Sequence, residues 1–118
     1  MRGDSGYAYL PAEQAEVEFG KYEERIKALE KLNEALPIIR EIGDRVVEVA
    51  ALCSIGVVYR SLGELRKALD TFNEALPIAQ AIGNRSVEVT ILGNIGAVYR
   101  SLGEMGKAVE EYNEALRI

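Results

Sequence analysis

An internal repeat with a period of 40 residues constrains this sequence more than any other feature. Residues 58–64 recur unchanged as residues 98–104, and 21 of the 35 positions from 44 to 78 are identical to those from 84 to 118. A fixed period of this length predicts a solenoid, because each unit buries its apolar face only by packing against its neighbours. The chain of 118 residues has the size of a single domain.

Each complete unit predicts two helices. In the unit of residues 44–83, two sets of apolar residues recur every three or four positions, which is the spacing of one helix face. Gly63 and Gly83 follow these sets, where a glycine commonly ends a helix, and Asn84 is a candidate cap for the next helix. The expected fold is therefore all-α, with helices near residues 46–62, 65–82, 86–102 and 105–118.

The apolar positions of these units also carry a family resemblance. The pattern Leu52-x-x-Ile55-Gly56-x-x-Tyr59 followed by Ala68-x-x-x-Phe72 resembles the tetratricopeptide repeat, and residues 92–112 repeat the pattern in register. The longer period resembles the variant found in kinesin light chains, cell-polarity adaptors and bacterial, notably cyanobacterial, signalling proteins. This resemblance implies antiparallel helix pairs that stack into a right-handed α-solenoid. The glycines of the pattern have no side chain and so allow the paired helices to approach closely.

Residues 11–43 fit the pattern only as a degenerate first unit. Pro11 lies where the interior of the unit's first helix should be, and Glu23 replaces the glycine of the turn. We therefore expect one long N-terminal helix from about residue 11 to residue 42, with Pro11 in its first turn and a weak point at Gly20. The alternative is a hairpin that turns near Gly20. Residues 1–10 are expected to be disordered or derived from a tag.

Two prolines depart from the family pattern. Pro37 and Pro77 lie inside the second helices predicted for their units. A proline in a helix interior removes one backbone hydrogen bond and usually kinks the helix. Because the apolar pattern continues through Ile78 and Ile82, we expect a kink at these prolines rather than a helix end.

Composition excludes several classes of function. The chain has 14 Lys and Arg against 19 Asp and Glu and no basic run, so it is a poor candidate for a nucleic-acid-binding protein. It has no His, which rules out imidazole catalysis and His metal sites, and its one Cys cannot form an intramolecular disulfide. No apolar stretch reaches the length of a membrane span. We expect a cytoplasmic protein that is not an enzyme and takes no cofactor or metal.

The resemblance places a candidate binding surface on the first helix of each unit. In tetratricopeptide arrays these helices line the concave face, and two stripes here carry small or polar residues at the spacing of one helix face. Arg60 and Arg100 near the ends of the stripes suit a partner carboxylate, and Asn94 occupies a place where related arrays hold a peptide backbone. The candidate partner-binding residues are Ala50, Cys53, Ser54, Val57, Arg60 and Ser61 with Thr90, Gly93, Asn94, Ala97, Arg100 and Ser101.

Two classes of function remain open at this level. The first is a scaffold that binds a partner peptide or helix on the concave face. The second is a structural self-assembly module without an external ligand, because two complete helix pairs leave both ends of the array open. The second reading predicts a homo-oligomer formed through the N-terminal helix, with or without domain swapping, or through the open ends. The sequence also allows a fragment of a longer array or an engineered repeat.

Overall fold

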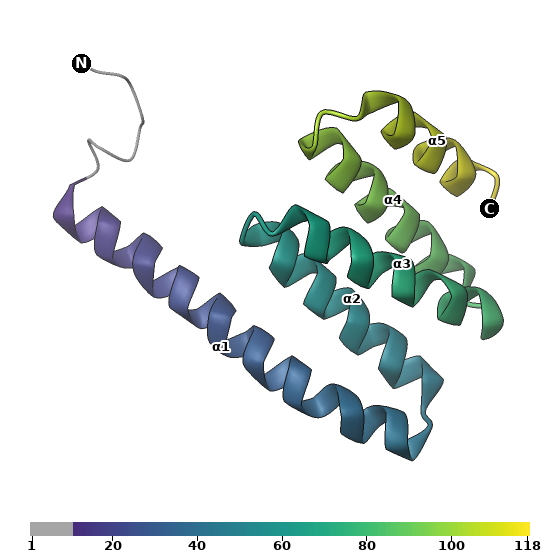
Figure 1. Cartoon of the computed structure of the whole chain (residues 1–118), viewed down its shortest axis with the longest axis horizontal. Helices are drawn as coiled ribbons and strands as arrows, with labels where there is room; N and C mark the ends of the chain where they lie inside the picture. Colours follow the sequence, from purple (N-terminus) through teal and green to yellow (C-terminus); the bar gives the residue numbers. More distant parts are fainter. Residues whose placement is uncertain (1–10) are drawn as a thin grey trace.

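The computed structural model describes residues 11–118, so the expectation for residues 1–10 lies outside the described residues. The described residues form five helices and no strand (Figure 1). α2 packs against α3 and α4 against α5, while α1 and α3 also contact the first helix of the next pair. This is the helical solenoid that the repeat predicts. The helices are α1 (Ala12–Ile42), α2 (Arg45–Ser61), α3 (Leu65–Ala81), α4 (Arg85–Ser101) and α5 (Met105–Leu116).

Short turns that contain a glycine connect the helices. Gly63 has a φ of 78°, a left-handed conformation that strains residues with a side chain. The amide of Glu64 donates to the carbonyl oxygen of Tyr59 over 2.9 Å, which closes the end of α2 as in a Schellman motif. In the first unit Glu23 takes the place of this glycine, and the helix continues through it. The other turn glycines with positive φ are Gly43, Gly83 and Gly103.

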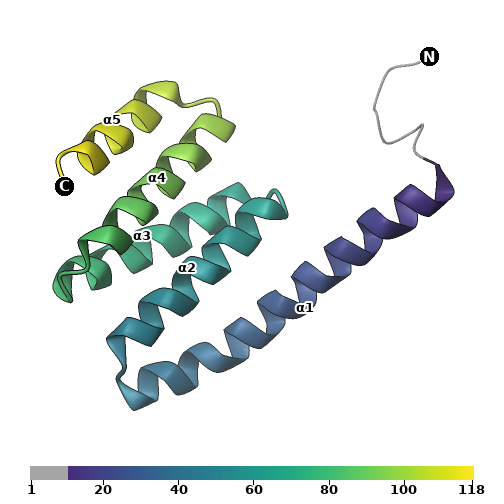
Figure 2. The ribbon, with the colours of Figure 1, turned by 180° about the vertical axis from the view of Figure 1, so that it is seen from behind.

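α1 is a single helix, without the turn near Gly20 that a hairpin would require. It begins directly after Pro11, whose missing amide hydrogen is not needed at a helix start. Its C-terminal half packs against α2, whereas its N-terminal half extends away from the other helices (Figures 1 and 2). Neither Pro37 in α1 nor Pro77 in α3 ends its helix, in agreement with the continuing apolar pattern.

Two glycines allow the paired helices to approach closely. A Cβ atom on Gly56 would lie 2.7 Å from two ring atoms of Phe72, and one on Gly96 would lie 2.5 Å from Cε1 of Tyr112. Phe72 is the largest fully buried side chain, and burial of such a side chain contributes about 1.5–3 kcal/mol. The other large and fully buried side chains are Leu52, Ile91, Ile95 and Val98.

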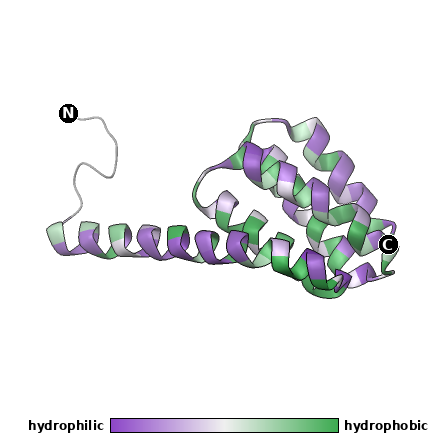
Figure 3. Cartoon of the chain, turned by 60° about the horizontal axis from the view of Figure 1, so that its bottom comes forward, coloured by the Kyte–Doolittle hydropathy of each residue, from purple (hydrophilic) through white to green (hydrophobic). Residues whose placement is uncertain are grey.

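Apolar positions that are buried on α3 are exposed at the equivalent places of α1 and α5 within residues 11–118. On α5 Val109 is 50% exposed, whereas Leu69 at the same position of α3 is only 7% exposed. On α1 Ile38 is 60% exposed, whereas Ile78 at the same position of α3 is 9% exposed. Figure 3 shows hydrophobic and hydrophilic segments alternating along α1 where this helix leaves the other four. The middle pair α2–α3 is therefore covered on both sides, and the outer helices are not.

Arg40 links the first three helices. Its Nε donates to Glu48 on α2 over 3.0 Å, and its guanidinium also pairs with Glu74 on α3. Arg45 donates to the other oxygen of Glu48 over 3.1 Å. Burial alone would raise the pKa of the Glu48 carboxyl, but its hydrogen bonds to the two guanidinium groups outweigh burial and hold that pKa below its ordinary value. The next unit repeats this contact, since the residues 40 positions later, Gln80 and Glu88, form a hydrogen bond of 3.2 Å.

Candidate functional site

The predicted binding residues lie on one surface, formed by α2 and α4. These two helices lie side by side and are in contact (Figure 2), and we call their shared surface the α2–α4 face. Most of the predicted residues are exposed on it, and Cys53, Gly93 and Asn94 are partly buried. Ala97 is an exception, because it is buried with 8% exposure and offers almost no surface to a ligand. The exposed members are Ala50, Ser54, Val57, Arg60, Ser61, Thr90, Arg100 and Ser101.

The structure brings two of the predicted residues into direct contact across the helix boundary. The guanidinium of Arg60 on α2 donates to Oδ1 of Asn94 on α4 over 2.7 Å. The amide nitrogen of Asn94 donates in turn to the backbone oxygen of Thr90 over 3.0 Å. This chain of bonds orients the Arg60 side chain along the face. The sequence indicates each residue separately but not their bond, because the two are 34 positions apart.

An apolar hollow opens at the other end of the same face. It has a volume of about 220 Å³ and lies between the first turns of α2 and α4 and the turn before α4. Three predicted residues, Ala50, Cys53 and Thr90, form part of its wall, and burial raises the pKa of the Cys53 thiol. The residues predicted from the sequence do not include the rest of the wall, because those lining residues lie one helical turn earlier or in the connecting turn. The missed lining residues are Val46, Val49, Ile82, Asn84 and Val87.

The α2–α4 face is the basic part of an acidic chain. α2 and α4 each contain two arginines and one glutamate, so each helix has a formal charge of +1, whereas the whole chain has −5. In α2, Glu48 is already neutralised by Arg40 and Arg45. Arg100 is exposed and forms no side-chain hydrogen bond or ion pair with residues 11–118. The face thus presents one arginine held by Asn94 and one without a partner in the described residues.

Comparison with known proteins agrees with this architecture. The family model described as tetratricopeptide repeat matches residues 19–81, which is more than half of the chain. The chain belongs to the tetratricopeptide repeat family. A second tetratricopeptide repeat model matches residues 89–118. Repeats of this family generally mediate protein–protein interaction.

A solved tetratricopeptide repeat domain has a similar fold. The chain resembles the crystal structure of the domain from Arabidopsis FLU with a TM-score of 0.74 and 23% sequence identity. The similarity covers 88% of this chain and 87% of that one, and at this identity it concerns the fold alone. A comparison with curated protein sequences finds no match.

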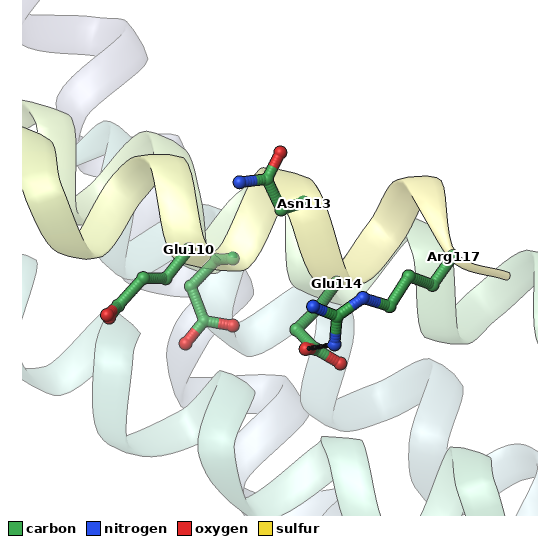
Figure 4. Close-up of a pocket in the computed structure, with 5 residues that line it drawn as sticks. Glu110, Asn113, Glu114 and Arg117 are labelled. Carbon is green, nitrogen blue, oxygen red and sulfur yellow. Dashed lines mark hydrogen bonds and ion pairs between the residues drawn. The ribbon is translucent and has the colours of Figure 1, made fainter.

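The last helix of the tetratricopeptide array carries a second, acidic hollow (Figure 4). It has a volume of about 450 Å³, and all its lining residues come from α5 and the residue that follows it. Burial, together with the charges of Glu114 and Glu110, raises the pKa of Glu111. Arg117 pairs with Glu114 and so neutralises one carboxylate of the group. A surface formed by one helix flank lacks the convergent walls of a binding cleft, so we regard it as a solvated flank of α5.

Residues 11–118 contain no group of three or more Cys, Asp or Glu placed to hold a metal ion. Within the same range, no helix of this tetratricopeptide domain has both the length and the apolar content that a membrane crossing requires.

Proposed function

We propose that the α2–α4 face binds an acidic segment of a partner protein, as a binding module without catalysis. The main support is Arg100, which is exposed on the basic face of an acidic chain and has no hydrogen-bond or ion-pair partner among residues 11–118. Carboxylates suit this face because guanidinium groups bind them through two parallel hydrogen bonds. The tetratricopeptide family supports protein binding in general, and the charge distribution indicates the kind of partner.

The apolar hollow adds a second recognition element. Its wall of mainly aliphatic residues favours an uncharged apolar side chain of the ligand. Cys53 in this wall and Arg60 lie seven residues apart on α2, which corresponds to about 10 Å along the helix. An extended peptide covers this distance with about three residues. We therefore expect a ligand in which a leucine-sized side chain and a carboxylate are separated by about three residues.

The bond between Arg60 and Asn94 still leaves Arg60 able to bind a ligand. A guanidinium has five N–H donors, and the contact with Asn94 Oδ1 uses one of them. Asn94 holds the group in place, so less side-chain entropy is lost when a carboxylate binds. Arg100 lacks such a holder within the described residues and would become ordered on binding.

Fluorescence anisotropy with two synthetic peptides tests this proposal. The first peptide is extended, with one leucine and two glutamates three and four residues later, and the second has lysines in place of the glutamates. We expect the acidic peptide to bind more tightly and Arg100→Glu to weaken it at least tenfold, about 1.4 kcal/mol. Arg66→Glu, an exposed reversal on α3, is the control for the change in net charge, and it also removes the ion pair between Arg66 and Glu104.

Cys53 gives an independent measure of where the peptide binds. Its thiol lines the hollow, and it is the only cysteine of the chain. A bound peptide should slow the alkylation of this thiol, measured above pH 8.5 because burial raises its pKa. Equal binding of the acidic and basic peptides, or equal effects of Arg100→Glu and Arg66→Glu, would contradict the proposal.

A further inference from the structure

The α2–α4 face carries a second hollow directly beside the first. It has a volume of about 430 Å³, and its wall comes from the first two turns of α4 and from a residue beyond the end of α5. Thr90 belongs to the walls of both hollows, so a ligand seated in the first hollow lies next to the second. The residues that line the second hollow are Arg85, Ser86, Val89, Thr90 and Ile118.

The repeat explains why the two hollows occur side by side. α2 lines the first hollow with Val46, Val49 and Ala50, and the residues 40 positions later on α4 line the second. The same three positions therefore form a hollow twice, so the hollow is a feature of the first helix of the repeat. Val89 is 38% exposed, whereas Val49 is 2% exposed, so the apolar wall of the second hollow is accessible to a ligand.

Arg85 gives the second hollow a cation. It is exposed and forms no side-chain hydrogen bond or ion pair with residues 11–118. Arg45, 40 positions earlier, pairs with Glu48, but the corresponding Glu88 accepts a hydrogen bond from Gln80 on α3 instead. None of the residues that line the hollow is acidic. A ligand in the second hollow therefore meets a guanidinium beside aliphatic side chains.

We propose that the acidic partner segment continues across Thr90 and places a second apolar side chain, next to a carboxylate, in the second hollow. This inference rests on the proposed function, because it extends the same ligand by one further contact. Two observations identify the occupant. The shared wall at Thr90 makes the second hollow continuous with the first, and Arg85 at its wall favours a carboxylate.

The distance between α2 and α4 sets the spacing of the two apolar side chains. Equivalent positions of these two helices line the hollows, and the helices are in contact. Axes of packed helices lie about 8–10 Å apart. An extended peptide advances about 3.3 Å per residue. We therefore expect the second apolar residue about three positions away from the first, on the side opposite to the carboxylates that bind Arg60 and Arg100.

Fluorescence anisotropy with a longer peptide tests the second hollow. The short acidic peptide of the proposed function receives an N-terminal extension in which a glutamate precedes a leucine, and this leucine stands three residues before the original one. A control peptide carries glutamine and serine at these two added positions. We expect the extended peptide to bind at least tenfold more tightly than the short one, whereas the control peptide should bind like the short one.

Variants of α4 separate the second hollow from the first. Val89→Ser should return the affinity for the extended peptide to that for the short peptide and leave the short peptide unaffected, because Val89 lines only the second hollow. Arg85→Gln should remove part of the gain. Val109→Ser changes a 50% exposed valine on α5 and is the matched control. Arg100→Glu should weaken both peptides, because it tests the proposed function itself.

The outcomes distinguish the two proposals. Binding of the short peptide without any gain from the extension would overturn the second hollow and leave the proposed function standing. A gain that persists in Val89→Ser would place the added residues elsewhere and also overturn this inference. If neither peptide binds, both proposals fail. Sedimentation equilibrium tests a different occupant: a wild-type dimer that Val89→Ser dissociates would show that a second copy covers the hollow, against the proposal.

Discussion

Replacing Gly56 by alanine tests whether close contact at a glycine fixes the distance between α2 and α3. The new Cβ would lie 2.7 Å from Cε1 and Cζ of Phe72, about 1 Å nearer than carbon atoms normally approach. Phe72 is 0% exposed, so its ring cannot move without displacing the core. Overpacking costs about 1–3 kcal/mol, and alanine gains about 1 kcal/mol over glycine within a helix. The expected net loss of unfolding free energy is therefore up to about 2 kcal/mol.

The chain provides two matched comparisons for this substitution. Gly93 lies within α4, and a Cβ there would meet nothing within 4 Å, so Gly93→Ala should gain about 1 kcal/mol. Gly96→Ala would press on Tyr112, which is partly exposed on the last helix and has room to move. We therefore expect its loss to be smaller than that of Gly56→Ala.

Urea unfolding followed by far-UV circular dichroism measures all three variants against the wild type. Unchanged m-values would show that differences in midpoint report stability. The reasoning is refuted if Gly56→Ala proves as stabilising as Gly93→Ala, since the two would then share only the helix-propensity effect. Equal losses for Gly56→Ala and Gly96→Ala would instead show that the mobility of the facing ring is irrelevant.

Three further substitutions test contacts of the fold and of the α2–α4 face. Glu48→Gln should cost about 1–3 kcal/mol of unfolding free energy near neutral pH. Because the pKa of Glu48 is lowered in the folded state, this contribution is present above the ordinary value of 4.5 and is lost as the pH falls through the folded value. The unfolding free energies of the wild type and the variant should therefore converge in acid. Asp44→Ala should cost about 1 kcal/mol in urea unfolding, because its carboxylate accepts from two amides at the start of α2, whereas Glu64→Ala at a helix start without such a bond should cost little. Asn94→Ser should free Arg60 and keep or strengthen binding of the acidic peptide in the anisotropy assay; weaker binding would show that Asn94 itself contacts the peptide.

Most of the fold could be predicted because its signals are local. A glycine at each turn and apolar residues at helical spacing predict the ends of α2 to α5 to within two residues. The absence of glycine at position 23 favoured one long helix, and the structure shows it. The candidate site was only partly predictable. The bond from Arg60 to Asn94, the burial of Ala97 and the hollow around Val46 depend on how two helices meet, and periodicity within one helix does not contain that information.

The difference between Arg60 and Arg100 shows how position in the array changes the role of an identical residue. Both arginines end the first helix of their unit and follow the same local sequence. Arg60 has a following first helix, α4, and Asn94 on that helix accepts its hydrogen bond. Arg100 forms no such side-chain bond with residues 11–118. The repeat therefore duplicates the cation, but only Arg60 donates to a neighbouring helix within the described residues, so a carboxylate ligand should depend more on Arg100 than on Arg60.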